Sequence, residues 1–381
     1  MTRTIRRNLW LSLAALAVGL IGLVGMILLV LEPHELKAEQ ALELSFKHGA
    51  NTLTGTLLLP SGPGPHPVVS FVHGDGAQTR GLDQYALVMN AFLKAGIACY
   101  SWDKLGTGQS VGPHQSSWLE QTMRDRADEA AAAMAMLAQR PELDAKGSGL
   151  IAFSQGAWVL AEFAQGAKMD AEPAFLITVG GALDWPSQGE YFTRMRLQRA
   201  GVDEAQAVQR VISWQGAAPQ PDVAISHADY VRALQSYARA SPAPRGASAE
   251  PLSAQRYRFV ALNRSADVSS GLLQTQSPFL AVWGKEDLNV DAAASARRYA
   301  ELLNAGPIDQ ALHLIEAQHH AVKVFEGGDH KLLNPAHYAA QLPQEWTWGM
   351  SARYLWQAEE AFSPGYLELL PAWTLAQLRR R

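Results

Sequence analysis

Apolar residues in this chain gather into short runs that alternate with longer segments of helical periodicity. Eight runs have the length and composition of strands: 42–46, 53–59, 68–73, 97–101, 149–153, 175–179, 279–283 and 321–325. Four longer segments predict helices: 85–95, 118–139, 157–167 and 291–303. Nearly continuous apolar strands separated by helices form parallel sheets that are covered on both sides. The pattern therefore predicts an α/β fold with a mostly parallel central sheet and helices on both faces.

The alternation of strands and helices stops between residues 183 and 273. This segment is rich in Gln, Arg and Ala, and only pieces of it have helical periodicity. A long insertion between two core strands is typical of a lid over an active site. We expect two core segments, 41–182 and 274–381, with a helical lid at 183–273 between them. The apolar pattern of residues 364–381 predicts a last helix packed on the core.

The N-terminal apolar run has the length of a membrane span. Residues 9–31 carry no charge, and a helix of this length at ~1.5 Å per residue reaches roughly 34 Å, enough to cross a bilayer. A cleaved signal peptide usually has an apolar core of only ~7–15 residues that ends in small side chains. Here the run continues into Leu31-Glu-Pro-His-Glu, which favours a retained signal anchor.

Charges around this run predict its orientation. Three arginines lie in residues 1–8, and mainly acidic residues follow in 32–40. By the positive-inside rule, residues 1–8 form a cytoplasmic tail and residues 32–40 a tether. We therefore expect a single-pass protein of the cytoplasmic (inner) membrane with an extracytoplasmic catalytic domain.

Composition excludes several classes of protein. The 381 residues are 48% hydrophobic and 18% charged with a net charge of −4, unlike a disordered chain. Of 32 Lys and Arg, removing the three N-terminal arginines leaves 29 against 36 Asp and Glu, a net charge near −7. Such a field disfavours nucleic acid as a partner. A single cysteine, Cys99, excludes internal disulfides and Cys-rich zinc modules.

The sequence Leu150-Ile-Ala-Phe-Ser-Gln-Gly-Ala places Ser154 between a predicted strand and a predicted helix. A serine on such a sharp turn needs small residues two positions before and after it, and Ala152 and Gly156 are there. The usual G-x-S-x-G turn has Gly where this chain has Ala152. Ser154 is therefore a candidate nucleophile.

A glycine-rich turn, His73-Gly-Asp-Gly, follows another buried strand. Such a turn can aim a backbone N–H at the oxyanion of a tetrahedral intermediate, beside the N–H that follows the nucleophile. The candidate donors are the backbone N–H groups of Asp75 and Gln155. We expect His73 to brace this turn rather than act as a base.

An acid and a base follow two later strands. Asp287 ends Trp283-Gly-Lys-Glu-Asp, and His330 ends Gly327-Gly-Asp-His. A carboxylate at a strand end can accept from a histidine and hold its tautomer. Chain geometry at the turn favours Asp287 over the adjacent Glu286. The three candidates occur in the order Ser154, Asp287, His330, each at the end of a predicted core strand.

In this respect the chain resembles the α/β-hydrolase superfamily. It is most similar to exported serine esterases and to the related prolyl-oligopeptidase-like and dienelactone-hydrolase-like branches. The resemblance covers residues 41–182 and 274–340 and the tail helix. It includes Trp102-Asp-Lys-Leu-Gly-Thr-Gly-Gln-Ser, with Leu105 where Arg is common. It implies that Ser154 is the nucleophile, His330 the base and Asp287 the residue that orients the base.

We therefore expect a membrane-anchored serine hydrolase that cleaves small-molecule carboxylic esters or thioesters through an acyl-enzyme on Ser154. No cofactor is implied, and the histidines at 313, 319 and 320 lack the accompanying ligands of a metal site. Two alternatives remain: a prolyl-oligopeptidase-like serine peptidase, and a catalytically silent binding protein tethered to the membrane.

Overall fold

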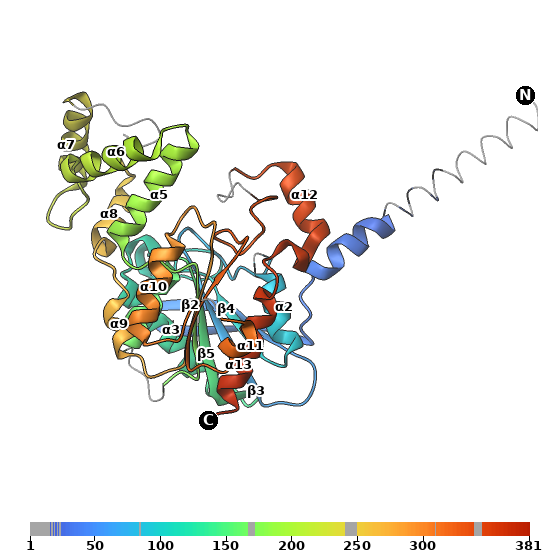
Figure 1. Ribbon diagram of the computed structural model, residues 1–381. Helices are drawn as coiled ribbons and strands as arrows, with labels where there is room; N and C mark the ends of the chain where they lie inside the picture. Colours follow the sequence, from blue (N-terminus) through green and yellow to red (C-terminus); the bar gives the residue numbers. More distant parts are fainter. Residues whose placement is uncertain are drawn as a thin grey trace, which may run out of the picture.

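Eight strands form a single sheet in the computed structural model (Figure 1). The structure describes residues 24–83, 85–166, 172–240, 250–308, 310–338 and 345–381, together with positions 16, 18, 20 and 22. The strands are β1 (Gln40–His48), β2 (Asn51–Leu59), β3 (His66–Val72), β4 (Ala98–Trp102), β5 (Leu143–Phe153), β6 (Leu176–Val179), β7 (Phe279–Gly284) and β8 (His320–Phe325). Their order in the sheet is β1-β2-β4-β3-β5-β6-β7-β8.

Pairing within the sheet is mostly parallel, as the sequence predicts. β1 and β2 form an antiparallel hairpin, and β2 pairs antiparallel with β4. All the pairs from β4 to β8 are parallel. The carboxyl ends of β3, β5, β6, β7 and β8 therefore meet at one edge, where α/β proteins place their ligand sites.

Helices cover both faces of the sheet. On one face lie α3 (Met123–Leu137), α4 (Gly156–Ala164) and α10 (Ala292–Leu303), whose apolar side chains share one core cluster. On the other lie α2 (Ala86–Lys94), α11 (Leu312–Glu316) and the last helix, α13 (Tyr366–Leu378). The predicted α/β architecture is confirmed, including the tail helix.

Two predicted boundaries differ most from the structure. The helix expected over 118–139 begins only at Met123, after the short η3 (Trp118–Glu120). The cause is local: the Thr122 side chain accepts from the Asp125 backbone N–H and the Asp125 carboxylate accepts from the Thr122 backbone N–H, which fixes the helix start. In contrast, β5 begins earlier than the apolar run at 149–153 indicates, at Leu143.

The segment between β6 and β7 is helical. It contains α5 (Trp185–Arg199), α6 (Glu204–Ala217), α7 (His227–Ala240), α8 (Ala254–Asn263) and α9 (Ser269–Gln274). Figure 1 shows that α5, α6 and α7 form a lobe that rises above the carboxyl edge of the sheet. Opposite this lobe stands α12 (Trp348–Gln357), a helix that the sequence pattern did not predict.

Nearly half of the predicted span at 9–31 lies outside the described residues. Residues 24–31 are helical and continue into η1 (Glu32–His34). Within the part of the chain that is described, no helix is both long and apolar enough to cross a membrane.

Candidate active site

Ser154 lies on a strained turn between β5 and α4. Its φ is +52°, in the left-handed region that residues other than glycine rarely adopt. Its backbone N–H donates to the Val179 carbonyl at 2.8 Å, which holds the turn against β6. A Cβ at Gly156 would lie 2.8 Å from the Val72 carbonyl oxygen, so only glycine lets the new helix pass this close to β3. The Ser154 hydroxyl consequently stands at the carboxyl edge of the sheet.

The structure brings together the three side chains that the sequence singles out. His330 Nε2 lies 3.0 Å from Ser154 Oγ, and His330 Nδ1 lies 2.6 Å from Asp287 Oδ2. These atoms come from the ends of β5, β7 and β8. A base within hydrogen-bond reach of a serine hydroxyl, itself held by a carboxylate, is the arrangement that activates a serine nucleophile. Glu286 is exposed to solvent, and Asp287 is the residue that meets the histidine.

Asp287 is buried, with 1% of its surface exposed, and its second oxygen is fixed by the backbone. Asp287 Oδ1 accepts from the N–H groups of Asn289 and Val290 at 2.7 and 2.9 Å. Only Oδ2 is directed at the imidazole. The carboxylate is therefore oriented before any substrate binds.

The surroundings of His330 favour its protonated form. Burial opposes the charge, but the nearby Asp287 carboxylate and its hydrogen bond outweigh burial and raise the pKa of His330 above 6.5. The neighbouring carboxyl group of Asp329 is also buried, which raises its pKa to about 6. Asp329 accepts from the backbone N–H groups of Lys331 and Leu333, so it shapes the loop that carries His330.

The turn after β3 runs beside the serine. A Cβ at Gly74 would lie 3.3 Å from Ser154 Cβ and 3.0 Å from the Phe153 carbonyl oxygen. Gly74 therefore permits the close approach that an oxyanion donor at Asp75 requires. Gln155, directly after the nucleophile candidate, is the N-cap residue of α4. The two predicted oxyanion donors thus lie on the two segments that flank Ser154.

The side chains of His73 and Lys104 support this turn through hydrogen bonds to backbone carbonyls. His73 Nε2 lies 2.7 Å from the Trp102 carbonyl oxygen and donates to it. Burial and the nearby Lys104 lower the pKa of His73 to about 3, so the ring stays neutral and serves as a brace. Lys104 Nζ donates to the carbonyls of Gly74 and Gly76, the latter at 2.8 Å. Burial lowers the pKa of Lys104 well below its usual range.

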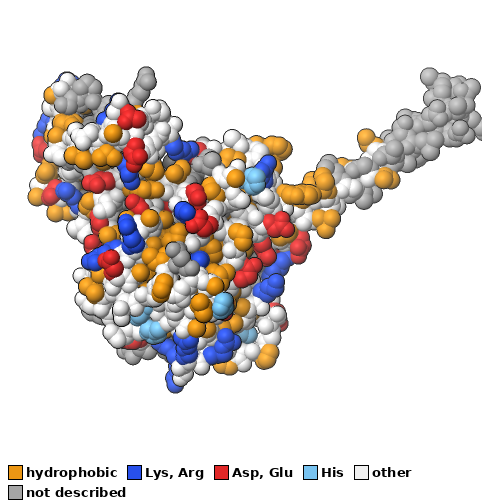
Figure 2. Space-filling model, viewed as in Figure 1, with side chains coloured by type: hydrophobic (Ala, Val, Ile, Leu, Met, Phe, Trp, Pro, Cys, Tyr) orange, Lys and Arg blue, Asp and Glu red, His pale blue; other side chains and the backbone are white. Residues whose placement is uncertain are grey.

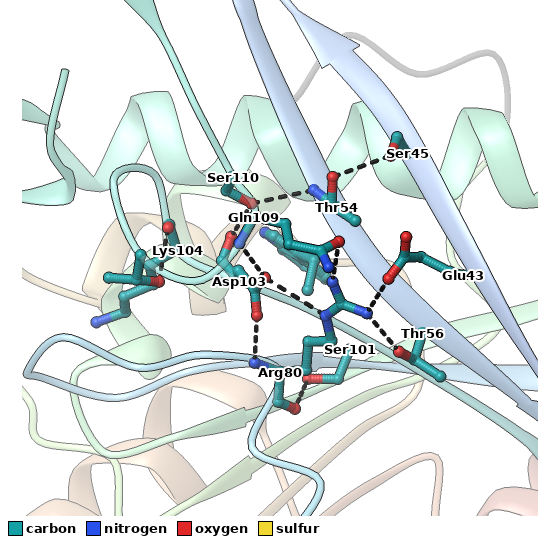
Figure 3. A network of polar contacts seen from close by, with 12 residues as sticks. Glu43, Ser45, Thr54, Thr56, Arg80, Ser101, Asp103, Lys104, Gln109 and Ser110 are labelled. Atoms are coloured by element: carbon teal, nitrogen blue, oxygen red, sulfur yellow. Dashed lines mark hydrogen bonds and ion pairs between the residues drawn. The ribbon is translucent and has the colours of Figure 1, made fainter. Parts of the chain in front are cut away.

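A polar network holds the loop that carries Lys104 (Figure 3). The buried Asp103 accepts from the backbone N–H groups of Arg80 and Gln109 at 2.8 and 2.7 Å. The Ser110 hydroxyl donates to the Asp103 carbonyl at 2.6 Å and accepts from the Thr54 N–H at 3.0 Å. The Asp-x-x-Gly-x-Gly-x-Ser motif is therefore structural: it fixes Lys104 against the turn at 73–76, which carries the predicted oxyanion donor Asp75 and is called the oxyanion turn below.

A second buried cation supports the same turn from α3. Arg126 donates to the His73 carbonyl at 2.6 Å and to Gln155 Oε1 at 3.2 Å, so it links the two oxyanion segments. Burial lowers the pKa of Arg126 to about 10. The nearby Glu129 accepts from Gln121 at 2.5 Å, and burial raises its pKa to about 7.

Among the described residues, two from the segment between β6 and β7 form hydrogen bonds with Asp75 and Asp287. Arg256 of α8 donates to both carboxylate oxygens of Asp75, at 2.8 and 2.6 Å. Tyr191 of α5 donates from its hydroxyl to the Asp287 backbone carbonyl at 2.7 Å. One contact is at Asp75, a predicted oxyanion donor, and the other is at Asp287, the acid of the candidate triad.

A cavity of about 480 Å³ opens at Ser154 and His330. Its wall is largely aromatic and aliphatic: Tyr85, Val88, Phe153, Val179, Leu333, Trp346, Tyr354, Phe362 and Tyr366. The polar residues include Gln78, Asp83, Asn289 and Lys331. Such a lining suits an apolar substrate held at one reactive polar end.

Sequence reasoning missed four supporting residues: Lys104, Arg126, Arg256 and Asp329. For Asp329 the signal was its position next to His330 in a glycine turn. Lys104, Arg126 and Arg256 are cations, and the sequence alone gives no reason to expect them away from solvent. In the structure Lys104 and Arg126 are buried. No cluster of three or more His, Cys, Asp and Glu among the described residues could hold a metal ion.

A known protein family matches the part of the chain that holds this geometry. The profile of the family described as serine aminopeptidase, S33, matches residues 63–335, which include all three triad candidates. The chain belongs to this family. It is therefore a member of the α/β-hydrolase superfamily, as the sequence resemblance implies. No curated protein sequence gives a match.

Solved structures give more distant matches. A proline iminopeptidase-related protein from Thermus thermophilus is 15% identical, with a TM-score of 0.49 over 88% of this chain and 99% of that one. A proline iminopeptidase from Mycobacterium smegmatis is 15% identical, with a TM-score of 0.48 over 83% and 98%. A membrane phospholipase A is 17% identical, with a TM-score of 0.46 over 87% and 93%.

Proposed function

We propose that this hydrolase cleaves carboxylic esters or thioesters through an acyl-enzyme on Ser154. Ser154 Oγ attacks the acyl carbon while its proton passes to His330 Nε2, and Asp287 stabilises the resulting imidazolium. The backbone N–H groups of Asp75 and Gln155 accommodate the negative oxygen of the tetrahedral intermediate. The imidazolium then protonates the leaving alcohol or thiol. A water molecule, activated by the same histidine, releases the acid and restores the serine.

The observation that carries this proposal is the Asp287–His330–Ser154 chain of contacts, at 2.6 and 3.0 Å, at the mouth of an apolar cavity. A fluorophosphonate probe should label the purified protein at one site, and peptide mapping should place the label on Ser154. Ser154→Ala should abolish both labelling and hydrolysis of a short chromogenic ester. Hydrolysis that survives Ser154→Ala in folded protein would refute the proposal, and a wild-type protein without either activity would support a silent binding role.

We also propose that residues 9–31 anchor the protein in the cytoplasmic membrane with the hydrolase domain outside. The support is the uncharged run behind three arginines. A reporter that is active only in the cytoplasm, fused after Arg381 in a bacterial host, should be silent. The matched fusion of a reporter that is active only outside the cytoplasm should be active. The reverse result would overturn the topology.

The segment 183–273 is proposed to act as a lid that selects the substrate. Its helices α5, α6 and α7 stand above the carboxyl edge of the sheet, and the candidate triad residues lie outside the segment. Replacing 183–273 by a short Gly/Ser linker should change the preference among esters of different chain length while probe labelling at Ser154 persists. Loss of all labelling in a variant that still folds would show that the segment is needed for catalytic competence.

A second candidate function is removal of an N-terminal residue from peptides. It is favoured by the family description and by Asp83, an acidic residue that lines the cavity and could pair with a substrate ammonium group. The discriminating experiment compares a short ester with a proline-containing peptide amide. If peptidase activity dominates and Asp83→Asn raises KM for the peptide alone, the peptidase function holds in place of the esterase.

A further inference from the structure

Two tryptophans on α12 are largely exposed to solvent. The exposed fraction is 87% for Trp348 and 70% for Trp356. The two residues lie eight positions apart, which places them about 80° apart around the helix axis. They therefore share one side of α12. Large apolar side chains gathered on an exposed surface mark a contact with another apolar phase.

The other side of α12 forms part of the cavity wall. Tyr354 lies about 160° from Trp356 around the helix axis, and it lines the cavity. Its ring lies 5.8 Å from that of Trp346 and 6.4 Å from that of Phe362, both also in the wall. One short helix thus has the cavity of the candidate active site on one side and two exposed tryptophans on the other.

The N-terminal segment lies against this same helix. His34 Nε2 is 3.1 Å from the Leu355 carbonyl oxygen, and the His34 ring is 5.3 Å from that of Tyr354. Figure 1 shows the N-terminal helix leaving the body beside α12. The described part of that helix is exposed and apolar, with 60% of Leu28 and 76% of Leu29 exposed. Figure 2 shows hydrophobic side chains along it up to the junction with the body.

Chain length limits how far α12 can be from the end of the apolar run. The uncharged run ends at Leu31, and His34 already contacts Leu355. Three residues span at most roughly 11 Å when fully extended. If residues 9–31 cross the bilayer, α12 therefore lies at the level of the lipid headgroups. Tryptophan is the side chain enriched at that level, because its ring is apolar and its N–H is polar.

We propose that α12 rests in the outer interface of the bilayer through Trp348 and Trp356, and that the cavity takes membrane-borne acyl esters directly from that leaflet. This inference rests on the proposed function, both on the anchor and on the ester hydrolysis. The surface fits lipid rather than a protein partner, because the apolar N-terminal run arrives at the same place.

A direct route from the bilayer matters most for long acyl chains. Each additional methylene in the acyl chain lowers the aqueous concentration of an ester that partitions into lipid about fourfold. A site that opened only to water would therefore meet almost none of a long-chain ester. A site whose wall lies in the interface meets it at its membrane concentration. The substrate class is thus set by where the cavity opens as well as by its lining.

The test uses the full chain reconstituted into vesicles of phosphatidylcholine and phosphatidylglycerol. Two esters are compared: soluble 4-nitrophenyl butyrate, and 4-methylumbelliferyl oleate held within the vesicles. The double variant Trp348→Ser, Trp356→Ser should keep kcat/KM for the soluble ester within about twofold. It should lose at least tenfold of its rate on the vesicle-borne ester. Leu273→Ser is the matched control: Leu273 is 64% exposed on α9, away from α12, and its loss should change neither rate.

The outcomes separate this inference from the proposed function. Equal rates of wild type and double variant on the vesicle-borne ester would overturn the inference and leave the esterase intact. A comparable loss in Leu273→Ser would also overturn it, because the effect would then not belong to α12. If wild type and Ser154→Ala hydrolyse the soluble ester equally, the proposed function itself fails. The soluble ester also reports whether the double variant is folded.

Discussion

Replacing Asp287 by asparagine tests the candidate triad most directly, because the surrounding hydrogen bonds fix how the new amide must sit. Two backbone N–H groups, from Asn289 and Val290, donate to Asp287 Oδ1 and require an acceptor there. An asparagine that keeps its oxygen at that place directs its NH₂ at His330 Nδ1, where Oδ2 now lies at 2.6 Å. The imidazole must then accept at Nδ1 and carry its proton on Nε2. In that tautomer, His330 cannot take the Ser154 proton.

The size of the expected loss of activity follows from the free-energy cost of the opposite orientation of the asparagine amide. Rotating the amide would leave the two backbone donors facing an NH₂ group, at about 1–3 kcal/mol for each buried donor left without an acceptor. A total of about 2–6 kcal/mol makes the productive orientation about 30-fold to 25,000-fold rarer. Loss of the carboxylate charge beside the imidazolium adds to this. We expect kcat to fall by ~10⁴, the size found when a triad histidine has the wrong tautomer.

The assay is steady-state hydrolysis of a soluble chromogenic ester, with thermal unfolding measured in parallel to show that the fold is kept. Glu286→Gln is the control, because it removes a neighbouring carboxylate that is exposed and should change the rate little. If Asp287→Asn stays within tenfold of the wild type, the tautomer argument is refuted. If Glu286→Gln is the crippling change, the assignment of the acid is wrong.

Three further predictions concern charge around the site. Because Asp287 raises the pKa of His330, kcat/KM should rise with pH as His330 loses its proton, with a midpoint above 6.5, and Asp287→Asn should lower that midpoint. Arg256→Gln should lower kcat only severalfold, because its pair with Asp75 is partly exposed and worth about 0.2–1 kcal/mol, and high salt should narrow the difference from wild type. Burial raises the pKa of Glu129 to about 7 from 4.5, so the free energy of unfolding should fall as pH rises through this interval. Urea titrations should show that Glu129→Gln removes this fall; an unchanged slope would mean that another group causes it.

The sheet and the triad candidates could be predicted because each depends on short-range sequence. A parallel strand buried on both faces is a nearly continuous apolar run, and the sequence has such a run for each of the parallel strands β3 to β8. Ser154, Asp287 and His330 each follow one of these runs within a few residues. Since parallel strands end at one edge, residues that follow them in sequence meet in space. Nothing about distant contacts was needed to expect that Asp287 would approach His330.

The supporting cations could not be predicted because their partners are distant in sequence and are backbone carbonyls. Lys104 donates to Gly74 and Gly76, and Arg126 donates to the His73 carbonyl. A carbonyl acceptor leaves no residue type to recognise, since every residue has one. A cation in a helix or turn is most often solvated, and only the fold shows that these two lie beneath the oxyanion turn.

α12 was not predicted because its apolar pattern differs from that of a helix packed on the core. The same kind of difference distinguishes the segments proposed to select the substrate from those that carry the candidate catalytic residues. A helix is recognised by one apolar stripe against a polar remainder. α12 has apolar side chains on two sides, Tyr354 toward the cavity and Trp348 and Trp356 toward the outside, so its apolar positions do not all face the core. That departure from the usual pattern is what the proposed position of α12, between a binding cavity and a lipid surface, requires. The candidate catalytic groups follow the regular strands and can be predicted from the sequence. The segments proposed to select the substrate, 183–273 and α12, are those that do not follow the regular alternation of strands and helices.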